Sequence, residues 1–153
     1  MSNPPFSYYP DIGMLGEDLV AEWLRSQGWQ ILHRRWRCRW GELDIIAQNT
    51  ATQILSFVEV KTRSRGNWDE GGLLSITPQK QAKLWRTATC YLTDYSHLND
   101  YPCRFDVALV YCQSLTTHPS STKKPAIFES LAIQVGNHQF KLMLQEYIPA
   151  AFG

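Results

Sequence analysis

Hydrophobic residues recur along the first part of the chain at the spacing of an amphipathic helix. Between Asp11 and Gln27 the apolar side chains fall within one half of a helical wheel, and Gly28 follows as a stop signal. A second helix is predicted from Thr77 to Tyr95, because a capping threonine precedes a proline and apolar residues then share one face. The pattern therefore indicates two helices separated by about a third of the chain.

Shorter segments rich in β-branched and aromatic residues are typical of strands. The expected strands cover 30–39, 42–48, 54–63, 104–112, 127–135 and 138–147. The second and third suit a hairpin, and the last two flank Gly136-Asn137 as another. A crossover helix before the fourth strand favours one parallel pairing, so the predicted class is α/β, with a mixed central sheet flanked by helices. The segments 64–76 and 114–125 are expected to be loops.

Composition narrows the classes of protein. The chain has 153 residues, of which 44% are hydrophobic and 19% charged, which is typical of one globular domain. We expect an irregular arm over 1–10, where three prolines occur, and a single domain over 11–153. No membrane segment or secretion signal is recognisable, and four cysteines without a CxxC pair favour free thiols, so a cytoplasmic location is expected. The net charge of +1 means that binding of nucleic acid would depend on a local patch.

Candidate chemistry lies on the second and third strands. Side chains alternate faces along a strand, so Glu42 shares a face with Asp44, and Glu59 shares one with Lys61. The third strand is otherwise apolar, and burying charges there is costly unless they are paired or bind a metal. One interpretation is therefore a structural ion pair, Glu59 with Lys61 or Asp44 with Arg63.

The other interpretation is a metal centre for phosphodiester hydrolysis. Asp44 and Glu59 together offer the hard oxygen ligands that Mg²⁺ prefers, and the Val60 carbonyl is a candidate third ligand. Bound metal makes water more acidic and polarises the phosphoryl oxygen. Lys61 beside it is suited to orient that water or to stabilise the transition state.

Two linked blocks carry a family resemblance. The run Gly41-Glu42-Leu43-Asp44-Ile45-Ile46-Ala47, followed by Phe57-Val58-Glu59-Val60-Lys61-Thr62-Arg63, resembles the YraN-type family, which is assigned to the PD-(D/E)xK, restriction-endonuclease-like superfamily. Further matching positions are Gly13, Gly16 and Glu17, Arg35, Arg37 and Arg39, Thr77 to Lys80, Arg104 to Asp106, and Tyr147 to Phe152. The resemblance thus covers nearly the whole chain.

The resemblance implies a restriction-endonuclease-like fold and a Mg²⁺- or Mn²⁺-dependent endonuclease acting on DNA, including branched or structured forms. Catalytic roles pass to Asp44, Glu59 and Lys61. In similar Holliday-junction resolvases of the archaeal type a glutamate on the first helix joins the metal site, which makes Glu17 a candidate; the alternative is a solvated helix glutamate. Departures from the pattern include Trp40 in place of a glycine and Leu43 in place of the superfamily's proline.

Basic residues precede and follow the two blocks. Alternation would place Arg35, Arg37 and Arg39 on one face, with Arg34, Trp36, Cys38 and Trp40 on the other. The arginines are candidates for phosphate contact, or they protect an exposed edge strand, and both tryptophans are expected in the core. Further candidates for contact with nucleic acid are Arg63, Arg65 and Lys80.

Two functional hypotheses remain open. The first is the Mg²⁺-dependent endonuclease, for which DNA is the expected partner, RNA is not excluded, and a homodimer would supply the two sites needed to cut a junction. The second is a module of the same fold that binds nucleic acid or a protein partner without cutting. The complete ligand set favours the first, because a binding module has no physical need for buried acids.

Overall fold

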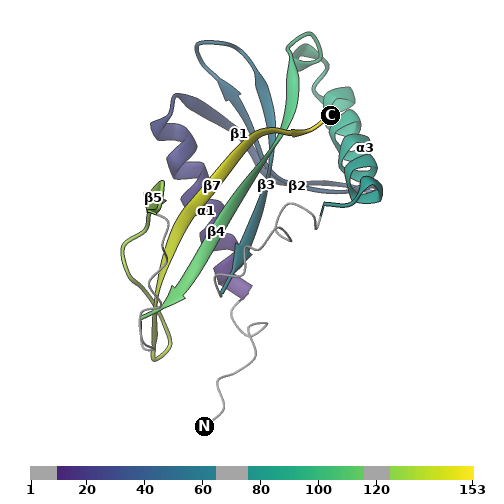
Figure 1. The fold of residues 1–153 in the computed structure, drawn as a ribbon. Helices are drawn as coiled ribbons and strands as arrows, with labels where there is room; N and C mark the ends of the chain where they lie inside the picture. Colours follow the sequence, from purple (N-terminus) through teal and green to yellow (C-terminus); the bar gives the residue numbers. More distant parts are fainter. Residues whose placement is uncertain (1–9, 65–75, 116–124) are drawn as a thin grey trace.

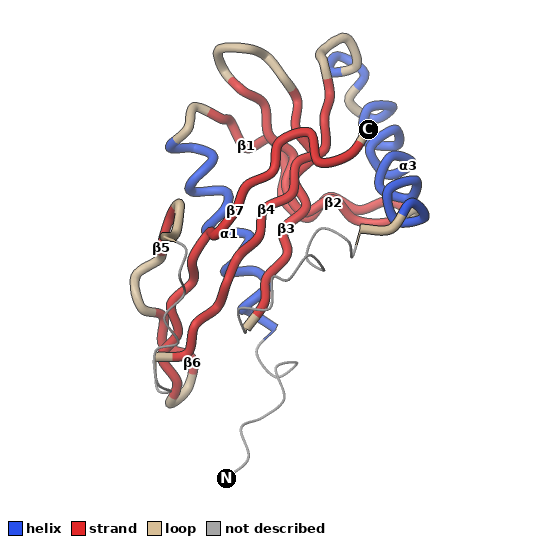
Figure 2. Tube along the Cα trace, viewed as in Figure 1, coloured by secondary structure: helices blue, strands red, loops and turns tan. Residues whose placement is uncertain are grey.

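A seven-stranded mixed sheet lies at the centre of this computed structural model, which describes residues 10–64, 76–115 and 125–153. One long helix lies against each face of the sheet (Figures 1 and 2). The elements are α1 (Pro10–Ser26), β1 (Trp29–Cys38), β2 (Gly41–Asn49), β3 (Leu55–Arg63), α3 (Pro78–Asp94), the 3-10 helix η2 (Ser96–Leu98), β4 (Cys103–Ser114), β5 (Phe128–Glu129), β6 (Ile133–Val135) and β7 (His138–Phe152). The predicted arm and the two predicted loops lie largely outside the described residues.

The strand order is β1-β2-β3-β4-β7-β5, and β6 pairs with β7 as well. β3 and β4 run parallel, whereas the other neighbours are antiparallel. The α/β class with a mixed sheet flanked by helices is therefore confirmed, as is the predicted β2–β3 hairpin. No helix in the described part of the chain is long and apolar enough to span a bilayer.

Two hydrophobic layers hold the helices to the sheet. β4 is the central strand, buried from Phe105 to Cys112, so it contributes side chains to both layers. On one face, Val20 and Leu24 of α1 are fully buried. On the other face, Tyr91 of α3 is fully buried. Each helix is therefore held on the sheet by the apolar face that its own sequence provides.

The helix and turn signals act as predicted. The Thr77 hydroxyl accepts a hydrogen bond from the Lys80 N–H at 3.2 Å and so caps α3. In the β2–β3 turn, the Asn49 side chain accepts from the N–H groups of Ala51 and Thr52, both at 2.9 Å. These local hydrogen bonds explain why the predicted boundaries of α3 and of the β2–β3 turn hold to within a residue or two.

The predicted alternation along β1 is wrong. Arg34 donates to Asp18 of α1 at 2.7 Å, whereas the Trp36 ring packs edge-on against Tyr91 of α3, with ring centroids 5.2 Å apart. Residue 35 interrupts the regular strand, because Arg35 has φ 52°, in the left-handed region. Arg34 and Arg35 consequently both reach α1, and Arg34 and Trp36 lie on opposite faces.

The last strand extends beyond the predicted end at Tyr147 and runs to Phe152. Asp106, fully buried on β4, accepts hydrogen bonds from the Tyr147 hydroxyl at 2.6 Å and from the Ala150 N–H at 2.9 Å. These bonds hold the strand in place beyond Pro149, where sequence would favour a stop. The partner arm of the predicted hairpin is divided into the two short strands β5 and β6.

Gly16 lets α1 approach β3 closely. A Cβ at this position would collide with the Thr62 hydroxyl, whereas a Cβ at Gly13, one turn earlier and exposed, would meet nothing within 4 Å. The residue after Gly16 is Glu17, so the close approach of the helix carries this carboxylate to the sheet.

Replacement by alanine should change the stability of the protein in opposite directions at Gly13 and Gly16. Gly13→Ala should raise the free energy of unfolding by about 0.5–1 kcal/mol through helix propensity. Gly16→Ala should lower it by about 1–3 kcal/mol, because the added methyl overpacks the contact with Thr62. Urea unfolding measures both.

Thr62→Ala provides the matched test of cause. Combined with Gly16→Ala, it should cost less than the sum of the two single changes, since the colliding hydroxyl is gone. Strict additivity would show that the Gly16–Thr62 contact is not what requires glycine.

Candidate metal centre

The site forms where β2 separates from β3. Pairing between the two strands reaches Ile45 and Val58 and then stops. Beyond this point, Asp44 turns its side chain into the gap, and its carboxylate accepts a hydrogen bond from the Val60 N–H at 2.9 Å. The carboxylate thereby satisfies a donor that the separation of the strands leaves without a β2 partner.

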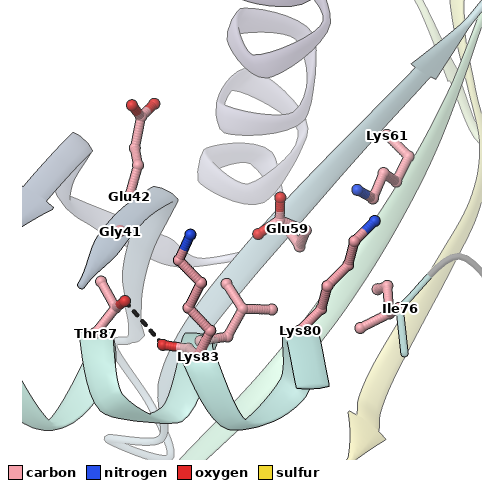
Figure 3. A pocket seen from close by; sticks show the side chains of 9 residues that line it. Gly41, Glu42, Glu59, Lys61, Ile76, Lys80, Lys83 and Thr87 are labelled. Atoms are coloured by element: carbon pink, nitrogen blue, oxygen red, sulfur yellow. Dashed lines mark hydrogen bonds between the residues drawn. The ribbon is translucent and has the colours of Figure 1, made fainter. Parts of the chain in front are cut away.

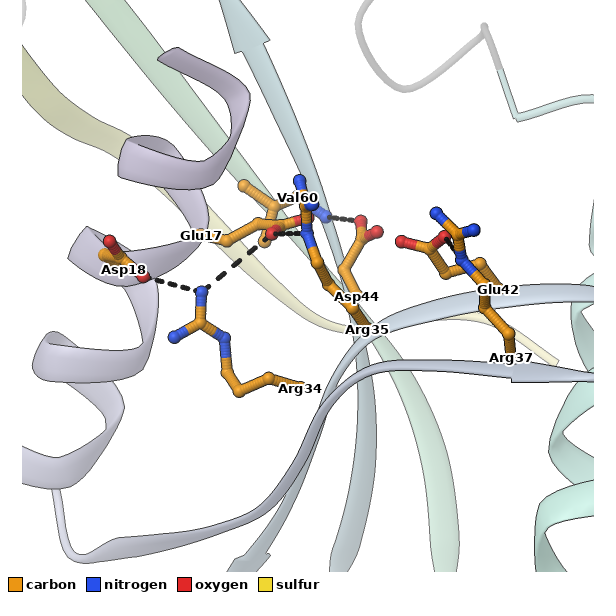
Figure 4. Close-up of polar contacts among 8 residues, drawn as sticks. All are labelled: Glu17, Asp18, Arg34, Arg35, Arg37, Glu42, Asp44 and Val60. Atoms are coloured by element: carbon orange, nitrogen blue, oxygen red, sulfur yellow. Dashed lines mark hydrogen bonds and ion pairs between the residues drawn. The ribbon is translucent and has the colours of Figure 1, made fainter. Parts of the chain in front are cut away.

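Three carboxylates from two elements meet at this gap. Glu17 of α1 and Glu42 and Asp44 of β2 each place an oxygen within 4.8 Å of the others. Glu17 is only 6% exposed, which excludes the alternative of a solvated helix glutamate. Figure 4 shows Glu17 and Asp44 approaching each other from the helix and the strand. We call Glu17, Glu42, Asp44 and the neighbouring Glu59 the acidic cluster.

Glu59 and Lys61 extend the site toward α3. Both side chains line a cavity of about 180 Å³, together with Lys80 and Lys83 from the first turns of α3. Figure 3 shows the three amines turned toward the space around Glu59. The shared face predicted for Glu59 and Lys61 is therefore observed. Amines of β3 and α3 thus border the same cavity as the carboxylates of Glu42 and Glu59.

Glu17, Asp44 and Glu59 of the acidic cluster have raised pKa values and so resist ionisation in the metal-free protein. Burial raises the pKa of Asp44 to about 8, and the charge of Glu59 is the second cause. Burial likewise raises the pKa of Glu59. The pKa of Glu17 is raised by burial against the opposing hydrogen bond from Arg35. A bound cation would remove this resistance, because it favours the ionised forms.

Arginines of β1 neutralise part of the acidic cluster from within the protein. Arg35 Nε lies 2.8 Å from Glu17, and Arg34 lies 3.9 Å from the same carboxylate. Arg37 Nε forms a 2.5 Å ion pair with Glu42. Arg35 and Arg37, two candidates for phosphate contact, are thus engaged by carboxylates of the site (Figure 4).

The other candidates for contact with nucleic acid are spread more widely. Arg39 is exposed, and its guanidinium lies 4.6 Å from the centre of the Trp40 ring. Lys80 is exposed beside the cavity, and Arg63 is exposed at the end of β3. Arg65 lies outside the described residues. For Val60, the hydrogen bond described involves the N–H, and ligation by its carbonyl stays a prediction.

Two further residues line the site, Glu42 and Lys83, and neither is predicted from the sequence as a site residue. Glu42 was placed on the face of Asp44, and that alternation was already the signal for a third ligand. Lys83 gave a weaker signal, three residues after Lys80 on the same helix. Trp40 was expected in the core, but it is 37% exposed, because the β1–β2 turn projects beyond the sheet toward α3 (Figure 1).

Comparison with known proteins places this geometry in a family. The sequence model of the Uncharacterised protein family UPF0102 matches residues 16–110, a span that includes the whole acidic cluster and Lys61. The chain belongs to this family. The resemblance noted from the Gly-Glu-Leu-Asp and Glu-Val-Lys blocks is thereby confirmed.

Three relatives within UPF0102 match over most of their own length. A UPF0102 protein of Trichodesmium erythraeum is 51% identical, over 93% of this chain and 88% of its own. A UPF0102 protein of Trichormus variabilis is 52% identical, over 93% of this chain and 94% of its own. A third, from Synechocystis, is 44% identical over 94% and 98%. Each of these alignments covers more than nine tenths of this chain.

The raised pKa of Asp44 predicts how stability depends on pH. The unfolded chain ionises this carboxyl near its usual value of 3.8, whereas the folded protein does so near 8. The contribution of Asp44 to stability is therefore complete below pH 3.8 and is lost as the pH rises toward 8. Urea unfolding in a chelator should show Asp44→Asn gaining stability relative to wild type between pH 5 and about 8.

Asp100→Asn, an exposed position away from the acidic cluster, controls for the general effect of replacing an aspartate. Parallel pH profiles of wild type and Asp44→Asn would contradict the assignment of a raised pKa to this group.

Proposed function

We propose that this protein is a Mg²⁺- or Mn²⁺-dependent endonuclease that hydrolyses phosphodiester bonds of DNA, including branched or structured DNA. The observation that carries the proposal is the acidic cluster at the separation of β2 and β3, bordered by the amine of Lys61. Carboxylates of like charge repel one another, and gathering them at a partly buried site is costly without a cation.

The chemistry of the donors fits Mg²⁺ or Mn²⁺. All four side chains offer hard oxygen atoms, and among the described residues neither cysteine nor histidine joins them, which disfavours zinc. Asp44 and Glu59 would hold the metal, with the Val60 carbonyl as a further candidate. Glu17 and Glu42 would join through a water or directly, once Arg35 and Arg37 release them. Bound metal would activate water and polarise the scissile phosphate.

Lys61 has a separate role in the proposal. Its amine lies on the same strand and face as Glu59, so it reaches the attacking water or a non-bridging phosphate oxygen. A positive charge held there stabilises the charge that builds up in the transition state. Its effect should appear in the rate of hydrolysis more than in the affinity for metal.

The family resemblance supports the same reaction. The order of a carboxylate on one strand and Glu-x-Lys on the next is similar to the PD-(D/E)xK pattern, and both blocks fall within the segment that matches UPF0102.

Metal binding and cleavage are tested with variants that separate ligation from catalysis. Asp44→Asn keeps an oxygen to accept the Val60 N–H while removing the charge, and Glu59→Gln is its counterpart. Calorimetry with Mn²⁺ should show binding to wild type that is lost in the double variant. Lys61→Gln should keep metal binding, and cleavage of junction or flap DNA should slow by roughly 100- to 1,000-fold.

Glu22→Gln, an exposed acid on α1, is the matched control and should bind and cleave as wild type does. Full cleavage by both Asp44→Asn and Glu59→Gln would refute the proposal. Binding of DNA without metal dependence or cleavage would favour the alternative of a non-catalytic binding module.

A further inference from the structure

Trp40 is held on the surface beside α3. Its ring lies 4.6 Å from the Arg39 guanidinium and 5.3 Å from that of Arg86, measured to the ring centre. The next residue, Gly41, packs directly on α3, since a Cβ there would lie 3.1 Å from the Thr87 hydroxyl. The hairpin therefore fixes the position of an indole that contributes little to the core.

Two hollows border this indole, and one of them adjoins the metal centre. One, of about 670 Å³, is lined by Trp40, Trp85 and Arg86 among others. A second, of about 460 Å³, is lined by Arg39, Trp40 and Lys83 among others. Lys83 also lines the cavity that contains Glu59. A continuous surface thus leads from the acidic cluster along α3 to Trp40.

This surface is basic. Lys80, Lys83 and Arg86 recur every three residues on α3, about 4.5 Å apart along its axis. Among the described residues, no ion pair involves any of the three. The β1 arginines differ in this respect, because Arg35 and Arg37 are paired with acids of the site.

We propose that this surface binds a single-stranded segment of the nucleic acid, with an unpaired base stacked on Trp40 and its phosphates along Lys80, Lys83 and Arg86. The inference rests on the proposed function for the identity of its ligand. The inference adds that the substrate carries unpaired nucleotides next to the scissile phosphate. It also assigns the main phosphate contacts to α3, where the sequence had favoured β1.

Single-stranded and duplex nucleic acids differ in whether the faces of their bases are accessible. In a duplex, every base is covered by its neighbours, so an exposed indole has no ring to stack on. In a single strand the bases are accessible, and aromatic side chains combined with a basic groove are the usual means of binding them. The guanidinium groups of Arg39 and Arg86 lie over the indole, so a stacking base would displace one of them and stack beside its cationic plane.

Binding is measured in a chelator, where no hydrolysis can occur, by the fluorescence anisotropy of labelled oligo-dT and of a duplex of equal length. Wild type should bind the single strand more tightly than the duplex. Trp40→Ala should weaken single-strand binding by roughly 5- to 150-fold, as expected for loss of one stacked base, while Trp40→Phe should retain most of it.

Lys83→Ala/Arg86→Ala tests the phosphate contacts separately. The slope of log affinity against log salt should become shallower by about 1.4, since each single-strand contact contributes about 0.7. Tyr101→Ala and Arg25→Ala are the matched controls, an exposed aromatic and an exposed arginine away from this surface, and should bind as wild type does. Thermal unfolding checks that each variant is folded.

Unchanged binding by Trp40→Ala, or preference for the duplex, would overturn the inference. Loss of affinity equal to that of the control variants would overturn it as well. Because the measurement is independent of metal, single-strand binding with the expected losses would stand even if no cleavage were found, so the two proposals fail separately.

Discussion

The acidic cluster gathers four carboxyl groups at the point where β2 separates from β3. The structure around the site depends on how their mutual repulsion is offset. Asp44 is stabilised by the Val60 N–H, and Glu17 by the guanidinium of Arg35. Even so, burial keeps the pKa of Asp44 and of Glu59 above their usual values. The metal-free fold is thus stabilised by its own cations in place of an external one, and the left-handed backbone at Arg35 is what allows that side chain to reach α1.

The helices on the two faces of the sheet supply different chemical groups to the proposed site. α1 supplies a carboxylate, and its close approach over Gly16 is what makes that carboxylate part of the site. α3 supplies amines, which border the cavity around Glu59 from the other side. The β1–β2 hairpin spans both, since Arg35 contacts α1 whereas Trp40 lies beside α3. A phosphate placed between the helices would therefore meet ligands for a metal on one side and positive charge on the other.

The sequence predicted features that depend on neighbouring residues. Caps, turns and apolar periodicity placed the helices and strands, and the period of two brought Glu59 and Lys61 to one face. It failed where one residue departs from regular geometry. The turn of the backbone at Arg35 leaves no hydrophobic signature, so alternation put Arg34 and Trp36 together. The exposure of Trp40 was equally inaccessible, because it depends on how the hairpin lies against α3, whereas the ion pair of Arg37 with Glu42 follows from the β1–β2 register.

The contacts of Asp106 bear on which part of the chain can fold by itself. It is fully buried in the central strand, and apart from Arg104 its partners are Tyr147 and Ala150, which lie beyond the segment shared with the family model. Residues 16–110 alone would leave this carboxylate with a single counter-charge and expose the long edge of β4 that β7 now covers. The segment that matches the family model and contains the acidic cluster is thus not autonomous. Its integrity is set by a strand whose own sequence contributes nothing to the acidic cluster.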